Sequence, residues 1–247
     1  YIESVESPRK FMSAARGAGR NKPVIVVKAG RSQQGQRAAA SHTGALAGSD
    51  LVYDAAIARA GMLRVDTLQQ LFLAAETLAR FRDGPSERLI VLTNGGGAGV
   101  MAADEAAAQG VPLAPLDADM LARLDAVLPA NWSRANPVDI IGDAPAGRYV
   151  AALEALAHDR ASAVLFIHAP TAIVPSAEIA QAVLPQVTAA PRRVLGSWVG
   201  ETAVAQARQT FRDAGVPDYP TPEDAVRAFG FLRTYREHQE ELLQTPP

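Results

Sequence analysis

A histidine and two hydroxyl side chains stand among small residues in the segment ASHTGALAGS, residues 40–49. An imidazole is a competent nucleophile near neutral pH, because its ordinary pKa is about 6.5. Ser41 and Thr43 can donate hydrogen bonds to an anion beside His42, and Gly44 lets the backbone approach it. The segment lies between an expected strand and an expected helix, and α/β sheets bind ligands beyond the carboxyl ends of their strands. The pattern predicts a loop that presents His42 to a bulky ligand. From spacing alone, a turn with a capping histidine is the alternative.

A second segment, TNGGGAGV at residues 93–100, directly follows the expected strand RLIVLT and opens an expected helix. Exposed amides at a helix N-terminus, with no side chains in the way, form an anion site. The spacing is neither that of a Walker loop nor that of a dinucleotide fingerprint. A tight turn with close helix packing is the alternative, although consecutive glycines cost backbone entropy. The predicted phosphate-binding residues are Asn94, Gly95, Gly96, Gly97, Ala98 and Gly99.

The composition excludes several other kinds of chemistry. The chain has no cysteine, which excludes disulfides, thiolate-bound metal and a thiol nucleophile, and which fits a cytoplasmic protein. No His/Asp/Glu cluster has the spacing of metal ligands, so we predict no metal site. The formal net charge is -2 and there is no basic run, which argues against nucleic acid as a partner. No apolar run is long enough to span a bilayer, so no membrane association is expected.

The remaining histidines and Trp198 carry weaker signals. His158 lies near the end of an expected helix, and His238 lies in a polar C-terminal helix. His168 ends the expected strand AVLFIHAP, where a structural histidine is favoured over one that lines a cleft. Trp198 ends another strand, and core packing is at least as well supported there as a place beside a ligand.

Apolar runs alternate with helix-period segments along the chain, which is typical of an α/β fold with parallel sheets. A polar Gly-Pro segment at residues 81–87 predicts a domain boundary. We expect two flavodoxin-like, doubly wound domains. Residues 1–84 hold about two strand–helix units, so this domain is expected to be truncated at its N-terminus. Residues 85–235 hold a complete five-stranded set, and residues 236–247 are expected to form a tail or linker.

Four segments resemble one family when they are taken together and in order. They are KPVIVVKAGRS, ASHTGALAGSD, LTNGGGAGVMAADE and NPVDI, and they resemble the NDP-forming acyl-CoA synthetases. These enzymes are relatives of succinyl-CoA synthetase and include the ADP-forming acetate–CoA ligases. The resemblance implies the reaction acyl-CoA + ADP + phosphate ⇌ acid + CoA + ATP, through an acyl phosphate and a phosphohistidine. It implies that His42, within Ser41–Ala45, carries the phosphoryl group and that Glu3 orients its ring.

The same resemblance implies partners for the chain. A CoA-binding Rossmann domain and an ATP-grasp domain, in the same or a partner chain, would complete the enzyme, with this chain as the middle of a larger polypeptide. Mg-ATP or ADP and CoA would be ligands of the parent enzyme, and this segment alone would bind no cofactor. The acid and phosphate are the expected small-molecule partners, and a homo-oligomer is compatible with the pattern.

Two other functions are compatible with the same residues. One is a catalytically silent, synthetase-like regulatory region of a bacterial protein lysine acetyltransferase. The small-residue frame around His42 favours an active enzyme over this alternative. The other is a generic flavodoxin-like binding module, and the lack of aromatic clamps at both loops disfavours flavin as its ligand.

Overall fold

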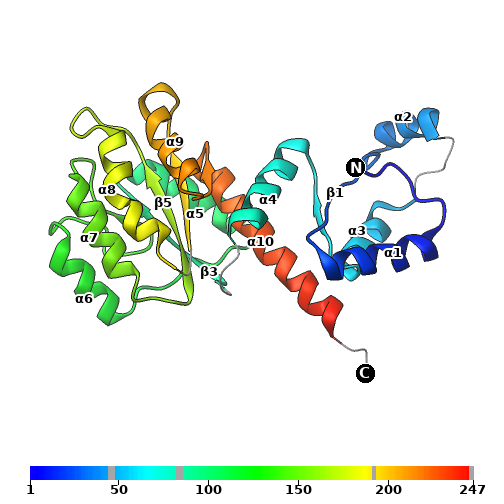
Figure 1. The fold of residues 1–247 in the computed structure, drawn as a ribbon, viewed down its shortest axis with the longest axis horizontal. Coiled ribbons are helices and arrows are strands. Elements are labelled where there is room, and N and C mark those ends of the chain that lie inside the picture. Colours follow the sequence, from blue (N-terminus) through cyan, green and yellow to red (C-terminus); the bar gives the residue numbers. More distant parts are fainter. Residues whose placement is uncertain (44–47, 82–85, 191–192, 245–247) are drawn as a thin grey trace. The chain divides into compact units, whose positions relative to one another are not determined.

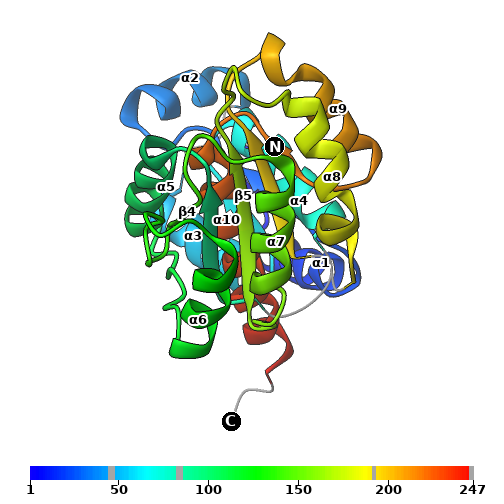
Figure 2. The same cartoon turned by 90° about the vertical axis from the view of Figure 1, so that its left-hand side faces the viewer.

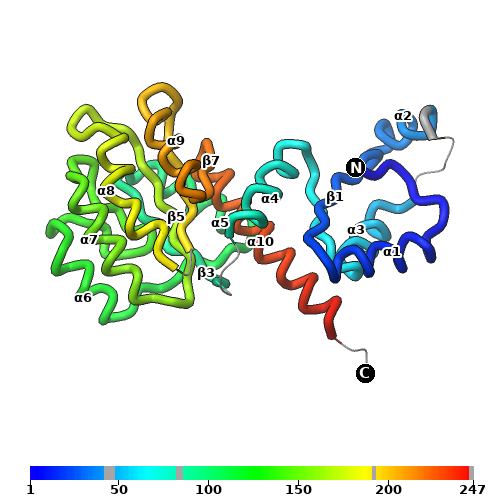
Figure 3. The backbone as a smooth tube through the Cα atoms, viewed as in Figure 1, coloured from blue at the N-terminus to red at the C-terminus, as the bar shows by residue number. Residues whose placement is uncertain are grey.

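The computed structural model describes residues 1–43, 48–81, 86–190 and 193–244 (Figure 1). The chain divides into two compact units, Tyr1–Leu78 together with Phe231–Pro247, and Ala79–Gly230. Each unit contains a parallel sheet of its own. Figure 3 traces the course of the backbone through both units. The α/β architecture expected from the alternating pattern is therefore confirmed.

The second unit alternates strands and helices and has flavodoxin-like topology. Its five strands are all parallel, in the order β4-β3-β5-β6-β7. The first strand of the unit thus stands second in the sheet, which is the doubly wound arrangement. The elements are β3 (Arg88–Thr93), α5 (Gly96–Ala108), α6 (Ala118–Val127), β4 (Val138–Asp139), α7 (Ala146–Leu156), β5 (Ser162–His168), α8 (Ser176–Thr188), β6 (Val194–Trp198), η1 (Thr202–Val204), α9 (Ala205–Asp213), β7 (Asp218–Tyr219) and the start of α10 (Pro222–Leu243).

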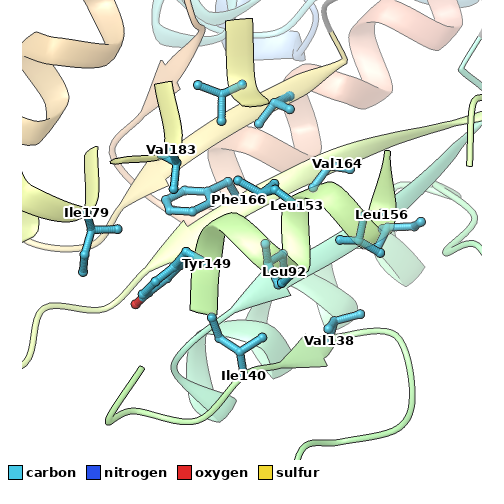
Figure 4. Close-up of a cluster of buried hydrophobic side chains, with 14 of the residues drawn as sticks. Leu92, Val138, Ile140, Tyr149, Leu153, Leu156, Val164, Phe166, Ile179 and Val183 are labelled. Carbon is cyan, nitrogen blue, oxygen red and sulfur yellow. The ribbon is translucent and has the colours of Figure 1, made fainter. Parts of the chain in front are cut away.

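Helices α6, α7, α8 and α9 pack side by side as one layer of this unit (Figure 2). Tyr149, Leu153 and Leu156 of α7 meet Leu92 and Phe166 of the sheet in a buried cluster (Figure 4). Burying each large side chain contributes about 1.5–3 kcal/mol. Helix α5 contacts β3 and β4, and it is tied to α10 by the Arg227–Glu105 ion pair at 2.8 Å. This packing holds the carboxyl ends of the strands in fixed positions.

A side-chain amide completes the sheet beside β3. The Oδ1 atom of Asn136 accepts from the Val91 amide at 2.9 Å, and its Nδ2 atom donates to the carbonyl oxygens of Leu89 and Ala114 at 2.9 Å. The short strand β4 pairs only with the carboxyl end of β3, at Leu92 and Thr93. The Asn136 amide therefore replaces ladder hydrogen bonds that the short strand cannot make, since buried backbone groups need partners.

The first unit is built on strands β1 (Ile25–Val27) and β2 (Leu63–Val65), with Ile2 bridged to Lys28, directly after β1. Helices α1 (Pro8–Asn21) and α3 (Asp50–Arg59) bury Ala15 and Ile57 against Val26, on one face. On the other face lie α4 (Leu68–Arg80) and the second half of α10, where Val27 packs with the Ala74 side chain. Helix α2 (Gln33–Thr43) follows β1.

The C-terminal residues differ from the tail or linker expected at 236–247. Within the described residues, they continue α10 and group with the first unit. Leu242 is 2% exposed, and the Gln239 side chain donates to the carbonyl oxygens of Gly61 and Gly19. The residues Phe231, Tyr235 and Leu242 recur at helical spacing, so this polar segment has one apolar face. Its charged residues favour a linker when the sequence is read alone, whereas the apolar face acts only through contacts with distant residues.

None of the described helices is both long and apolar enough to cross a bilayer.

Two glycines of α1 offer a test of this packing. A Cβ at Gly19 would overlap the carbonyl oxygen of Ala60, whereas a Cβ at Gly17 would have nothing within 4 Å. We expect Gly19→Ala to lower the free energy of unfolding by about 1–3 kcal/mol, because α1 must move off α3. Gly17→Ala should raise it by about 0.5–1 kcal/mol through helix propensity. Urea unfolding of both variants measures the difference, and equal effects would contradict the close approach at Gly19.

Candidate functional site

The first turn of α5 presents open backbone amides. Its N-cap, Gly95, is extended and no side chain of the described residues caps the helix. The amides of Gly96, Gly97 and Ala98 occupy the helical positions that have no intrahelical acceptor. Gly96 and Gly97 are exposed, and a Cβ at Gly97 would have nothing within 4 Å. The predicted strand–loop–helix context is confirmed, and the arrangement can hold an anion on neutral dipoles.

Two of the predicted phosphate-binding glycines have other roles. The Gly95 amide donates to Thr93 Oγ1 at 3.0 Å, and the Gly99 amide donates to the Gly95 carbonyl at 3.1 Å. A Cβ at Gly99 would lie 3.0 Å from Thr93 Cγ2 and 3.2 Å from Pro137 Cβ. Close packing of the helix against Thr93 and Pro137 therefore explains the glycine at position 99. The amide of Gly95 is used by the turn itself, through its bond to Thr93.

The side chain of Asn94 faces the protein and not the open turn. Asn94 is 3% exposed, its Nδ2 atom donates to the Ala169 carbonyl at 2.8 Å, and its Oδ1 atom accepts from the Ala169 amide at 2.8 Å. Both ends of the amide are therefore occupied within the protein. The sequence predicts that Asn94 binds phosphate; the structure shows its side chain bonded to the β5–α8 connection, and contact with phosphate stays a prediction.

A carboxylate that the sequence analysis did not assign borders the same turn. A Cβ at Gly96 would lie 3.1 Å from Asp139 Oδ2, while Asp139 Oδ1 accepts from the Ile141 amide at 2.9 Å. Ile141 has φ 71°, in the left-handed region that a β-branched residue rarely adopts. Such strain persists only where surrounding contacts hold it, as the Asp139 bond does here. The segment NPVDI could have indicated this carboxylate, because it places Asp139 at the end of an expected strand.

The structure corrects the expectation that His42 lies in a loop. Helix α2 extends through Thr43, so the backbones of Ser41, His42 and Thr43 form its last turn. Ser32 begins this helix, because its hydroxyl accepts from the Gly35 amide at 3.1 Å, and the alanines at 38–40 favour its continuation. The Ser41 hydroxyl donates to the Ala38 carbonyl at 2.6 Å.

The side chains of His42 and Thr43, and all of Gly44, lie outside the described part of the chain. Their predicted contacts with an anion therefore stay predictions.

Glu3 lies at the carboxyl end of the sheet in the first unit. It follows Ile2, which pairs with Lys28, and its Oε1 atom accepts from the Tyr1 hydroxyl at 3.1 Å. Lys28 is 2% exposed, and its ammonium lies 4.5 Å from the centroid of the Tyr53 ring. Burial lowers the pKa of Lys28, and the charge of Asp50 opposes that shift. Glu3 thus stands near a buried cation, at the sheet edge where a ligand would bind.

An open cavity of about 580 Å³ lies at this edge of the first unit. Arg31 in its wall pairs with Asp66, and also with Asp50 at 3.5 Å. Arg64 pairs with the same Asp50 at 2.5 Å. The charged groups of the cavity are therefore largely matched with one another. The remaining lining residues are Val27, Lys28, Ala29, Gly30, Ser32 and Gly35.

His168 is a structural residue of the second unit, as the sequence favours. It is fully buried, and hydrogen bonds join Nδ1 and the Tyr149 hydroxyl at 2.9 Å, and Nε2 and Ser176 Oγ at 3.0 Å. Its ring centroid lies 5.0 Å from that of Trp198, which is also buried, so core packing accounts for both. Burial lowers the pKa of His168 to about 4, because the charged form would lose its hydration.

Comparison with known families covers both units. The succinyl-CoA ligase-like flavodoxin domain matches residues 1–78, and the Ligase-CoA domain matches residues 89–238. The chain belongs to the NDP-forming acyl-CoA synthetase family. The resemblance identified from the sequence motifs is thereby confirmed, as is the assignment of two flavodoxin-like domains.

Relatives in this family align with nearly all of the chain. The ADP-forming acetate–CoA ligase I of Archaeoglobus fulgidus is 39% identical over 236 residues, 95% of this chain and 33% of that protein. The α subunit of ADP-forming acetate–CoA ligase I of Pyrococcus furiosus is 37% identical over 238 residues, 94% of this chain and 51% of that protein. The chain thus spans a third to a half of these curated relatives. Their names give no support to the regulatory alternative.

A solved synthetase of the family has the same fold. The dinucleotide-forming acetyl-coenzyme A synthetase 1 of Ca. Korarchaeum cryptofilum, in complex with phosphate and ADP, superposes with a TM-score of 0.91 at 32% identity. The match covers 100% of this chain and 55% of that chain.

The buried histidine of this family member predicts a pH-dependent stability. Since the pKa of His168 is about 4 in the folded chain, against about 6.5 when unfolded, the unfolded chain binds the extra proton and folding weakens as the pH falls. We expect a loss of about 2 kcal/mol between pH 7 and pH 5 from this group. His168→Asn should lack this contribution in urea unfolding, and the exposed His158→Asn should retain it. The same slope in all three proteins would contradict the assignment.

Proposed function

We propose that the chain is the phosphohistidine-bearing core of an NDP-forming acyl-CoA synthetase. The enzyme would convert acyl-CoA, ADP and phosphate into acid, CoA and ATP, through an acyl phosphate and phospho-His42. The observation that carries this proposal is the uncapped first turn of α5, with open amides at Gly96–Ala98, in a chain that also contains the family's Ser-His-Thr-Gly-Ala segment. That turn supplies neutral donors for a phosphoryl group, and His42 supplies the nucleophile.

Each step assigns a role to groups of this chain. Phosphate, held on the α5 amides, attacks the thioester carbonyl, the C–S bond breaks and CoA leaves. An imidazole nitrogen of His42 then attacks the phosphorus of the acyl phosphate, and the carboxylate of the acid is the leaving group. The Glu3 carboxylate accepts a hydrogen bond from the N–H of the other ring nitrogen and stabilises the positive charge that develops on the ring. Transfer to ADP finally gives ATP and restores the imidazole. Amides fixed by the fold stabilise phosphoryl charge without reorganising during the reaction.

The parent enzyme requires parts beyond the residues of this chain. We propose that a CoA-binding domain and a nucleotide-binding domain, in the same or a partner chain, supply the thiol and the ADP. The names of the relatives support this, because one of them is an α subunit and therefore assembles with other subunits. Mg-ATP, ADP and CoA would act as substrates of the whole enzyme, and this chain alone would carry no resident cofactor.

Phosphorylation of the whole enzyme tests the role of His42. With labelled ATP and Mg²⁺, we expect label that is lost in acid and stable in base, as a phosphoimidazole is. His42→Ala should abolish the label and the overall activity. Alanine is the best helix former, so the end of α2 is preserved. ADP, or the acid together with CoA, should discharge the label.

The matched control is His158→Ala, because His158 is exposed and lies in the other unit. It should be labelled like the wild type. Label that survives in His42→Ala would assign the phosphoryl group to another residue. A wild-type enzyme that turns over without any labelled intermediate would contradict the proposed mechanism.

A further inference from the structure

The amide of Asn94 joins two loops that are distant in the sequence. Its two hydrogen bonds to the backbone of Ala169, both 2.8 Å, connect residues 75 positions apart. A primary amide that donates to a carbonyl and accepts from the adjacent N–H copies the pattern of a peptide group in a ladder. With 3% of Asn94 exposed, water competes little for either bond.

This clamp lies where the ladder between β3 and β5 ends. The last paired residues are Thr93 and Ile167, and beyond them the chain turns toward α5 on one side and toward α8 on the other. Asn94 adds one more connection at the point where the two loops separate. Ligands of doubly wound sheets bind in the crevice at such a switch point. The clamp therefore sets the direction in which the glycine-rich loop leaves the sheet.

The partner of the clamp is itself held firmly. His168, immediately before Ala169, is bonded through its side chain to Tyr149 and Ser176, and its carbonyl accepts from the Val199 amide at 2.9 Å. On the other side of the clamp, a Cβ at Gly95 would lie 3.0 Å from the Ala169 Cβ. The glycine-rich loop is thus pressed against a rigid support.

The glycines that follow need such a support. Gly95, Gly96 and Gly97 have more backbone freedom than any other residue type, so an untethered loop would have to be ordered each time it bound an anion. Thr93 Oγ1 fixes the Gly95 amide, and the Asn94 clamp fixes the residue between them. Together they hold the amides of α5 in one arrangement before any ligand arrives.

We infer that Asn94 is a positioning residue, which orders the amides of Gly96–Ala98 for phosphate without contacting it. This inference rests on the proposed anion site at the start of α5. It assigns Asn94 a function that its glycine-rich surroundings do not reveal, because the neighbouring residues suggest a direct ligand. A displaced amide cradle should bind phosphate about ten to a hundred times more weakly.

The test uses the ¹⁵N-labelled chain and inorganic phosphate as the probe. Two variants are compared with the wild type. Asn94→Ala removes both bonds, and Asn94→Asp keeps the size and one acceptor but loses the donor to the Ala169 carbonyl. Heteronuclear NOE values of residues 95–98 are measured without phosphate, and the dissociation constant is measured by titration. The exposed Asn131→Ala is the matched control in the same unit. If Asn94→Ala fails to fold, Asn94→Asp carries the comparison.

We expect both Asn94 variants to show lower NOE values at residues 95–98 without phosphate, and weaker phosphate binding, with Asn131→Ala unchanged. Weaker binding with an unchanged NOE would overturn the inference, because it would make Asn94 a direct ligand. Unchanged binding with an unchanged NOE would overturn it as well, as would a mobile loop that binds phosphate normally. A wild-type chain that binds no phosphate at millimolar concentrations would refute the proposed anion site. The phosphate-free NOE values would still show whether Asn94 orders the loop.

Discussion

Backbone N–H groups without acceptors at the first turn of α5 are the constraint around which the second unit is organised. A helix that begins directly after a buried strand must leave these donors facing the sheet edge. Among the described residues no side chain caps them, and Gly97 leaves open space in front of the turn, while Asp139 Oδ2 lies close to Gly96. Thr93 and Asn94, just before the turn, bond to neighbouring backbone and so hold the turn in place.

The two units treat charge differently at the carboxyl ends of their strands. The first unit gathers Lys28, Arg31 and Arg64 with Asp50 and Asp66, and these groups largely neutralise one another. The second unit offers neutral amides beside the carboxylate of Asp139. A site lined by cations has to keep those charges out of water when no anion is bound, which costs desolvation free energy. Neutral dipoles bind an anion without that cost. Under the proposed function the phosphoryl group must leave again, and a weaker attraction of this kind would favour its release.

Two histidines of this chain lie in different environments, and the environment of each limits what its ring can do. His168 ends a strand, its two ring nitrogens are hydrogen-bonded to Tyr149 and Ser176, and its ring packs on Trp198. Burial lowers its pKa and so keeps the ring neutral. His42 comes at the end of an alanine-rich helix. An imidazole that is buried and hydrogen-bonded through both nitrogens cannot approach a phosphoryl group. The backbone position of His42, at the end of a helix, imposes no such restriction.

The sequence by itself determined the α/β class, the two-domain pattern and the junction of β3 with α5, because periodicity and glycine placement are local signals. Motif order was enough to identify the family. Other features depended on contacts between residues far apart in the chain. Asn94 became a clamp only because β5 brings Ala169 beside it. The C-terminal segment joins the first unit through contacts with distant residues, such as the bonds from Gln239 to the carbonyl oxygens of Gly19 and Gly61. Even α2 was misjudged, since the small residues that suggest a loop around His42 are also strong helix formers. Local patterns report propensity, and tertiary contacts decide which groups remain free to act.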